Sequence, residues 1–392
     1  MNPVDSLSPR TLNAIRQTSL IVGGVGLLAG VAGAFLNPAQ FWQSYLLAYI
    51  FWLQFPLGCL AVLMLHHLVG GRWGFVIRRW LESGAMTLPA LAVLFIPLLL
   101  GLSQLYHWTN PDTLAASSLL QHKSLYLNLP FFLARTVAYF VIWIGLAYLL
   151  NRWSLEQDRS GEPGLTTKLR RLSAIGMILY VLTATFAAYD WLMSLEPEWF
   201  SSIYGVLFIV GQVLAALALA VMGLRFLSAK GRPLASLVAR SDFNDLGNFM
   251  LAFVMIWAYI AFSQFLIIWS ANIPEEAVWY FHRSQGGWQW VGIVLILFHF
   301  VLPFFVLLSR RAKRQAQLLS VLAALMIAMR LVDLFWLIVP AFYPTGLHLH
   351  WLDGVMPIAL GGIWLAALTW QLAGKPLLPR QAPGAQEVFE HA

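Results

Sequence analysis

The stretch YDWLMSLEPEWF, residues 189–200, places Asp190 inside an otherwise apolar segment, about two helical turns before its end. A second stretch, VDLFWLIVPAFY at residues 332–343, has the same form. In both stretches the aspartate, Asp190 or Asp333, lies seven residues before a proline, and an aromatic pair follows soon after that proline. A pattern that recurs in this way predicts two copies of one structural unit.

Two shorter matches support the repeat. The tripeptide HKS at 122–124 corresponds to HRS at 282–284, and Ser-Gln at 103–104 corresponds to Ser-Gln at 263–264, both at an offset of 160 residues. The two aspartates are only 143 residues apart, because the basic loop 151–171 is longer than its counterpart 309–317.

The composition predicts a protein that crosses a membrane many times. The chain has 392 residues, of which 60% are hydrophobic and 10% are charged, too few charges for a soluble surface. Stretches long enough to span a bilayer, about 20 residues each, lie at 18–36, 42–65, 86–105, 129–150, 172–194, 203–226, 247–270, 288–308, 318–339 and 350–371. The repeat relates spans two to five to spans six to nine. Because four is an even number, both halves have the same orientation, unlike the inverted repeats of many secondary transporters.

The basic residues predict the orientation of these spans. Twenty of the 24 lysines and arginines lie in the termini and loops on the N-terminal side. Lys123 and Arg283 lie on the other side, and Arg135 and Arg330 lie inside spans. Under the positive-inside rule both termini are cytoplasmic, and the net charge of +7 reflects contact with the bilayer, not with nucleic acid.

We therefore expect an all-α polytopic membrane protein with ten transmembrane helices. Two parallel-repeat four-helix bundles, at 41–200 and 201–346, are joined by one flanking helix at each end of the chain, in 1–40 and 347–392. Glycines at 23, 26, 30 and 33 form a small-residue stripe on the first span, which indicates close packing against another helix. The polar, proline-containing tail after Ala373 is expected to be disordered.

Charged side chains inside spans are costly, which makes them candidates for function. Arg135 in span four and Asp190 in span five both lie about 9 Å below the outer boundary, so we expect them to form an ion pair. Arg330 and Asp333 are three residues apart on one helix and are expected to pair within it. Two interpretations stay open, a buried pair that sets helix register and a group that transfers protons or lies near a quinone.

One face of span five is lined by polar and small side chains. The face comprises Ser173, Gly176, Tyr180, Thr183, Ala187, Asp190 and Ser194, at alternating steps of three and four. Such a face is expected to point to other helices or to water, and it could carry a water chain to Asp190, with Glu196 and Glu198 at the outer exit. His299 in span eight is a further candidate, although a lone histidine there is more often a hydrogen-bonded packing residue.

The sequence gives no reason to expect a redox centre or metal ion in this chain. Its one cysteine, Cys59, excludes disulfide frameworks, iron–sulfur ligation and c-type haem attachment within the chain. A membrane b-haem needs two histidines at equal depth on facing helices, and no such pair is found. His122 and His282, on the outer side, are candidates only through the HKS and HRS matches. No catalytic residue is predicted.

Three motifs carry a resemblance to a known family. They are HKSLYLNLPFFLAR at 122–135, AYDWLMSLEPEWFSSIYG at 188–205 and ANIPEEAVWYFHRSQGGW at 271–288. Through them the chain resembles, over essentially its whole length, the F subunits (ActF) of bacterial alternative complex III, a quinol:cytochrome c oxidoreductase. Those subunits share the NrfD-like architecture of polysulfide-reductase membrane subunits, with ten spans and two four-helix bundles.

The resemblance implies a location and a set of partners. The location is the bacterial inner membrane, and the partners are an ActC-like membrane subunit, an iron–sulfur subunit and c-type haem subunits. Menaquinol or ubiquinol would be found nearby, with no cofactor held by this chain. By the same resemblance Arg135, Asp190, Arg330 and Asp333 would belong to a proton-translocation route. Two other classes remain open, a purely structural membrane anchor of the complex and an independent secondary transporter.

Overall fold

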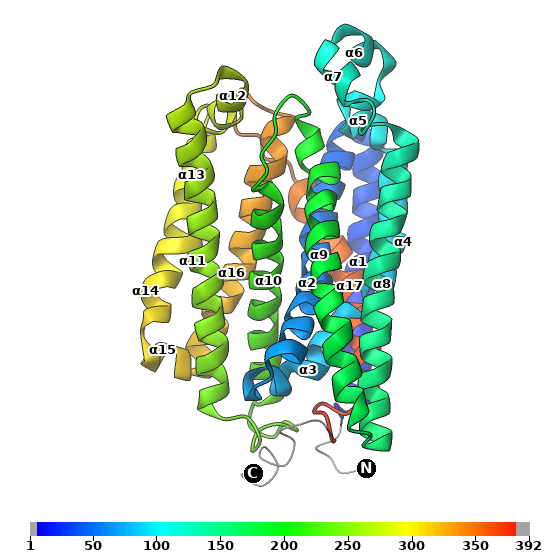
Figure 1. The fold of residues 1–392 in the computed structure, drawn as a ribbon, viewed down its shortest axis with the longest axis vertical. Coiled ribbons are helices and arrows are strands. Elements are labelled where there is room, and N and C mark those ends of the chain that lie inside the picture. Colours follow the sequence, from blue (N-terminus) through cyan, green and yellow to red (C-terminus); the bar gives the residue numbers. More distant parts are fainter. Residues whose placement is uncertain (1–5, 382–392) are drawn as a thin grey trace.

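Membrane-spanning helices account for most of the chain in a computed structural model, which describes residues 6–381 (Figure 1). The described residues contain ten helical segments long and apolar enough to cross a bilayer, and no strand. The prediction of an all-α polytopic membrane protein with ten spans is therefore confirmed.

The spans are α1 (Pro9–Leu36), α2 (Pro38–Val69), α3 (Arg72–Ala85) with α4 (Leu88–Leu100), α8 (Leu129–Ser160), α9 (Gly164–Trp191), α10 (Tyr204–Leu227), α11 (Arg240–Ala271), α13 (Trp288–Val294) with the π-helix η3 (Leu295–Val301) and α14 (Leu302–Leu308), α16 (Ala316–Ile338) and α17 (Leu352–Leu372). At one end of the molecule lie the short helices α5 (Leu102–Leu105), η1 (His107–Thr109), α6 (Pro111–Ala116), α7 (Ser118–Lys123) and α12 (Pro274–Arg283). We call this end the outer face. The other end, with α15 (Arg310–Arg314), is called the basic face. Single turns η2 (Met193–Leu195) and η4 (Val339–Ala341) follow α9 and α16.

The first helices of the two repeat units form the centre of the molecule. In α2 and α10, 94% and 78% of the most apolar stretch of 18 residues is buried, more than in any other described span. The two helices pack directly against each other, α2 also contacts α3, α4 and α9, and α10 also contacts α11 and α16. A Cβ atom added at Gly58 of α2 would lie 2.0 Å from the carbonyl oxygen of Gln212 in α10. The two backbones therefore approach as closely as a glycine allows.

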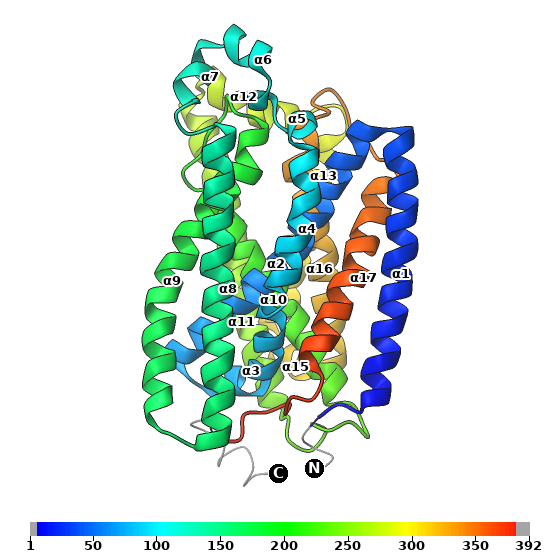
Figure 2. The ribbon, with the colours of Figure 1, turned by 90° about the vertical axis from the view of Figure 1, so that its right-hand side faces the viewer.

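The two flanking helices lie side by side, although they are at opposite ends of the chain. Helix α1 packs along α17, and α17 packs on α2 (Figure 2). The buried face of α1 includes the predicted glycine stripe, and a Cβ atom at Gly26 would lie 2.8 Å from the Cβ of Ala359. The close packing predicted for this stripe is confirmed.

Two predictions about the basic face were wrong. Span three was expected to begin at residue 86, but the helical span begins at Arg72, and Arg78 and Arg79 are buried within it. These arginines lie beside acids rather than in a loop, which hydropathy alone cannot detect. The tail after Ala373 was expected to be disordered, yet Leu377 and Leu378 are buried. Its last part, residues 382–392, lies outside the described residues.

Replacing Gly26 by leucine should separate α1 from α17, because the added side chain overlaps Ala359. Overpacking of this kind costs about 1–3 kcal/mol, so we expect G26L to lower the thermal unfolding temperature of the detergent-solubilised protein. The matched control is G24L, because a Cβ at Gly24 meets nothing within 4 Å. Equal melting temperatures for G26L and G24L would contradict the packing described above.

Candidate functional site

A buried ion pair lies in the first bundle between α8 and α9. Arg135 holds both oxygens of Asp190, Nε to Oδ2 and Nη2 to Oδ1, each at 2.8 Å. The Tyr139 hydroxyl donates a third hydrogen bond to Oδ2 at 2.7 Å. Arg135 also donates to the carbonyl oxygen of Tyr126 and lies 3.8 Å from the centre of its ring. The predicted pair is therefore formed, and both carboxylate oxygens of Asp190 have charged or hydroxyl donors.

Aromatic rings fill the space around this first pair. Phe140, Trp143 and Trp191 contact one another, with ring centroids 5.6 to 6.0 Å apart. The predicted polar face of α9 does point inward, since all of its seven members are buried. Its side-chain hydrogen bonds go to neighbouring helices or to the backbone of α9 itself. Tyr180 donates to Gln212 of α10, and Trp143 of α8 donates to Thr183 at 2.8 Å. Thr183 donates to the carbonyl oxygen of Leu179 at 2.6 Å.

A second buried ion pair lies in the second bundle, on α16. Arg330 donates from Nη1 to Oδ2 of Asp333, as predicted from their spacing. Trp257 of α11 donates to the same oxygen at 3.4 Å, and Arg330 Nε donates to Gln54 of α2 at 3.2 Å. Among residues 6–381 no hydrogen bond reaches Oδ1 of Asp333. This carboxylate is thus only half satisfied, unlike that of Asp190.

Asp333 borders a pocket of about 770 Å³ between α10, α11, α12, the α13–η3 span and α16. Most of its lining is apolar or aromatic, and at its mouth Tyr259, Phe262 and Ile296 are 57–69% exposed, as lipid-facing side chains are. The few polar lining groups are Asp333, Gln264, the hydroxyls of Tyr259 and Tyr280 and the indole nitrogens of Trp257, Trp279 and Trp336. Pockets of this size and character bind small molecules whose polar head is held by a few groups.

His299 lies in the π-helix next to this pocket. It is fully buried, its ring is 4.3 Å from that of Trp257, and neither ring nitrogen has a hydrogen-bond partner among the described residues. Buried polar groups are nearly always paired, and π-helical turns are frequent at functional sites. The expectation of a hydrogen-bonded packing residue is therefore not met. His299 instead lies against Trp257, which donates a hydrogen bond to Asp333.

The repeat explains why the two sites differ. At the offset of 160 that relates the HKS and HRS motifs, Arg135 corresponds to Leu295 and Tyr139 to His299. Leu295 lines the pocket. The second bundle thus has an apolar residue where the first has its cation, and the cation is instead Arg330 on α16. Moving the cation leaves one side of Asp333 open to the pocket.

Two glutamines connect the bundles across the centre. Gln54 of α2 accepts a hydrogen bond from Arg330 in the second bundle, and Gln212 of α10 accepts one from Tyr180 in the first. They correspond in the repeat, since Ser44 and Gln54 have the same spacing as Ser202 and Gln212. Arg330, in the ninth span, is therefore bonded to a central helix of the first bundle. Tyr180, in the fifth span, is bonded to a central helix of the second bundle. The sequence analysis missed both glutamines, although an amide inside an apolar span could have indicated them.

The outer loop after α9 is held by both members of the HKS and HRS match. Lys123 donates to the carbonyl oxygen of Pro197 at 2.6 Å, and Arg283 pairs with Glu196 at 2.7 Å. Nδ1 of His282 lies 3.5 Å from Glu196, whereas His122 is exposed on α7. Burial acts to raise the pKa of Glu196, yet the charge and hydrogen bonds of Arg283, together with the nearby His282, hold it below its ordinary value. The predicted exit acid Glu196 is thus part of a structural clamp.

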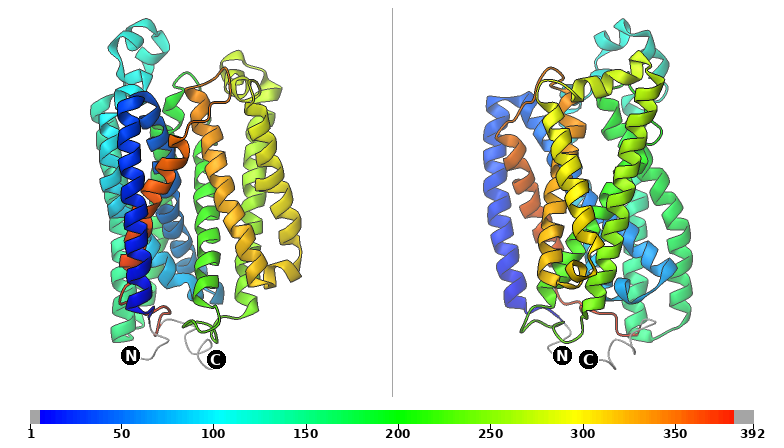
Figure 3. Two further views of the ribbon diagram at one scale, coloured as in Figure 1. Left: turned by 180° about the vertical axis from the view of Figure 1, so that it is seen from behind. Right: turned by 90° about the vertical axis from the view of Figure 1, so that its left-hand side faces the viewer.

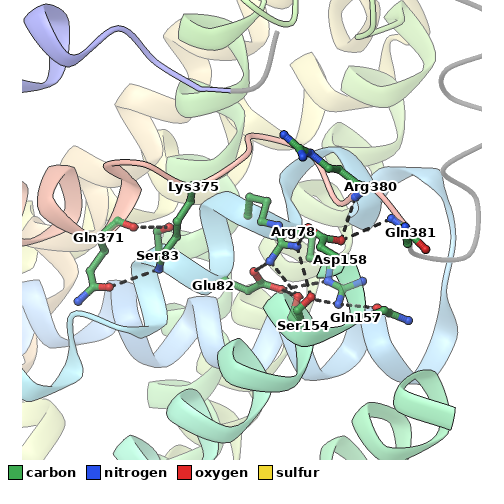
Figure 4. A network of polar contacts seen from close by, with 11 residues as sticks. Arg78, Glu82, Ser83, Ser154, Gln157, Asp158, Gln371, Lys375, Arg380 and Gln381 are labelled. Carbon is green, nitrogen blue, oxygen red and sulfur yellow. Dashed lines mark hydrogen bonds and ion pairs between the residues drawn. The ribbon is translucent and has the colours of Figure 1, made fainter. Parts of the chain in front are cut away.

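A buried polar network lies at the basic face of the first bundle (Figure 4). Glu82 accepts hydrogen bonds from Arg78, Arg79 and Ser154, and Arg79 also pairs with Asp158. The backbone N–H of residue 380, in the C-terminal segment, donates to Asp158 at 2.9 Å. The spacing of Arg78, Arg79 and Glu82, three and four residues apart, could have indicated this network.

Comparison with known proteins leaves the chain without a family assignment. No family model and no curated protein matches it. The described residues contain no group of three or more His, Cys, Asp or Glu side chains placed to hold a metal ion.

Breaking the first ion pair should cost more than removing it. The single changes R135Q and D190N each leave an unpaired buried charge, which costs about 3–5 kcal/mol. The double variant R135Q/D190N leaves two neutral groups, so its loss of stability should be smaller than the sum of the two by about 1–3 kcal/mol. Unfolding titrations of the purified protein in SDS measure this coupling, and simple additivity would show that the pair does not act as a unit.

The Glu196 clamp should make the outer loop sensitive to acid. Because the pKa of Glu196 is lowered in the folded protein, its contribution to stability is present above the ordinary pKa of 4.5 and is lost as the pH falls through the lower folded value. The difference in unfolding temperature between wild type and E196Q should therefore be constant near neutral pH and shrink below about pH 4.5. The exposed Glu198 provides the control variant E198Q. A difference that grows in acid would contradict this assignment.

Proposed function

We propose that the chain is the F-type, NrfD-like membrane subunit of an alternative complex III, a quinol:cytochrome c oxidoreductase, in the bacterial cytoplasmic membrane. The basic face is then cytoplasmic, in accordance with the positive-inside rule. Support comes from the three motifs of the resemblance and from the ten spans in two related bundles. Electron carriers belong to the partners, namely an iron–sulfur subunit, c-type haem subunits and an ActC-like membrane subunit.

The observation that carries this proposal is the half-satisfied carboxylate of Asp333 at an apolar pocket that opens toward lipid. A quinol reaches its site from the bilayer, and it releases two protons when its two electrons pass to a redox centre of a partner subunit. Asp333 Oδ1 is available to accept a proton from a quinol hydroxyl, with Arg330 compensating the carboxylate charge before transfer. The aromatic lining suits a flat ring with an isoprenoid tail.

Asp190 has a different part in this proposal. Its carboxylate has three donors, from Arg135 and Tyr139, and aromatic rings fill the space around it. A group bound so completely must lose several hydrogen bonds before it can take up a proton. We assign Asp190, as a buried pair that sets helix register, to the assembly of the first bundle. We assign Asp333 to proton transfer.

The test compares two aspartate variants in the native complex. A tagged chain isolated from native membranes should bring with it the iron–sulfur and haem-bearing subunits. In the assembled complex, D333N should lower quinol:cytochrome c turnover by about 100-fold, the usual effect of losing a general base. D190N should lower the yield and thermal stability of the complex, with turnover per assembled complex close to wild type.

Three outcomes would contradict the proposal. A chain that purifies alone, without redox-active partners, would favour an independent transporter. Unchanged turnover and proton release in assembled D333N would remove Asp333 from the proton route. Equal turnover losses in D190N and D333N would remove the distinction between the two sites. The exposed Glu198, replaced in E198Q, is the matched acid control.

A further inference from the structure

A second large pocket, of about 1030 Å³, lies at the basic face of the second bundle. It is formed by the end of α10, the loop to α11, the start of α11, α15 and the start of α16. Figure 3 shows α14 and the short helix that follows it at the lower edge of this bundle, next to α11. Six basic side chains line the pocket: Arg225, Lys230, Arg240, Arg310, Arg311 and Arg314.

Within residues 6–381 these six cations have no acidic partner. The other lining residues are uncharged, and in the described part of the chain no aspartate or glutamate forms an ion pair with any of the six. Elsewhere on the basic face the chain supplies its own acids. Arg79 pairs with Glu82 and Asp158, and Arg72 pairs with Asp242 at 2.9 Å. Like charges around one cavity repel each other, so an anion bound there would be strongly favoured.

The position of the pocket relative to the bilayer indicates the kind of anion. The pocket lies where α10 ends at Leu227 and where α16 begins at Ala316, which is the level of the lipid headgroups. Directly toward the membrane interior, neighbouring apolar side chains on α10 and α16 are exposed. These are Met222 at 37%, Leu318 at 40% and Val321 at 62%. An anionic head and apolar chains joined in one molecule would match both surfaces.

The geometry points to a binding site for an anionic phospholipid, with its phosphate group inside the six-cation pocket and its acyl chains along Met222, Leu318 and Val321. Arginine forks donate paired hydrogen bonds to phosphate oxygens, and basic pockets between spans at the cytoplasmic side bind acidic headgroups. Gln317, which accepts a hydrogen bond from Arg225 at 3.3 Å, helps to orient that guanidinium at the pocket wall. This site is separate from Asp333 and does not depend on a role in quinol oxidation.

The test uses the full chain in nanodiscs and a variant that removes three of the charges, R310Q/R311Q/R314Q. In phosphatidylcholine nanodiscs, adding phosphatidylglycerol should raise the unfolding temperature of wild type but not of this variant. Native mass spectrometry should show about 100-fold weaker retention of phosphatidylglycerol on the variant, since each basic residue near the headgroups contributes about 1 kcal/mol. The variant R310K/R311K/R314K keeps the charge and should retain most of the lipid, which separates loss of binding from misfolding.

The matched control is R152Q/R170Q/R171Q, which removes three exposed arginines from the basic face of the first bundle, outside the pocket. It should retain phosphatidylglycerol as wild type does. Equal lipid loss in the control and in R310Q/R311Q/R314Q would overturn the site, because nonspecific surface charge would then explain binding. Equal stabilisation of wild type by inorganic phosphate in phosphatidylcholine nanodiscs would overturn the lipid as ligand in favour of a free anion. The lipid proposal would also be overturned if R310Q/R311Q/R314Q kept the wild-type lipid content but no longer bound an acidic partner protein.

Discussion

The contact between α2 and α10 is the constraint on which the rest of the structure depends. Lipid tails are as apolar as leucine, so helices in a bilayer are held together by close packing and by hydrogen bonds between them. Both occur at this crossing. Gly58 lets the backbones meet, and Gln54 and Gln212 each reach a polar group in the opposite bundle. The position of Arg330, and with it the orientation of Asp333, therefore depends on the crossing of two helices that belong to different repeat units.

The repeat places two aspartates at equivalent positions and gives them opposite surroundings. Asp190 receives two bonds from one arginine and one from Tyr139, which leaves it no free oxygen. Asp333 shares one oxygen between Arg330 and Trp257 and keeps the other for the pocket. A buried charge is tolerated only when it is compensated, but full compensation also removes its capacity to react. One unit of the repeat thus has the arrangement suited to assembly and the other the arrangement suited to chemistry.

The sequence predicted the spans and the two ion pairs for a simple physical reason. An apolar run of sufficient length has few alternatives, and a charge within it must find the opposite charge at similar depth. It did not predict the pocket. At the pocket the second bundle has Leu295 where the first bundle has a cation, and it has a π-helical turn, which no periodicity in the sequence indicates. Nor did it predict that Arg78 and Arg283 are buried. Basic residues next to a loop look alike in sequence whether they face water or a neighbouring acid.

The π-helix links these observations. In the first bundle α8 is one continuous helix of 32 residues, and its rings fill the space beside Asp190. In the second bundle the corresponding span is interrupted by seven π-helical residues that include Leu295 and His299. Each π turn is wider than an α turn and displaces the side chains that follow it, and Ile296 and Phe300 of this turn line the pocket beside α16. The π-helical turn and the lost cation coincide at Leu295, which lines the pocket beside Asp333.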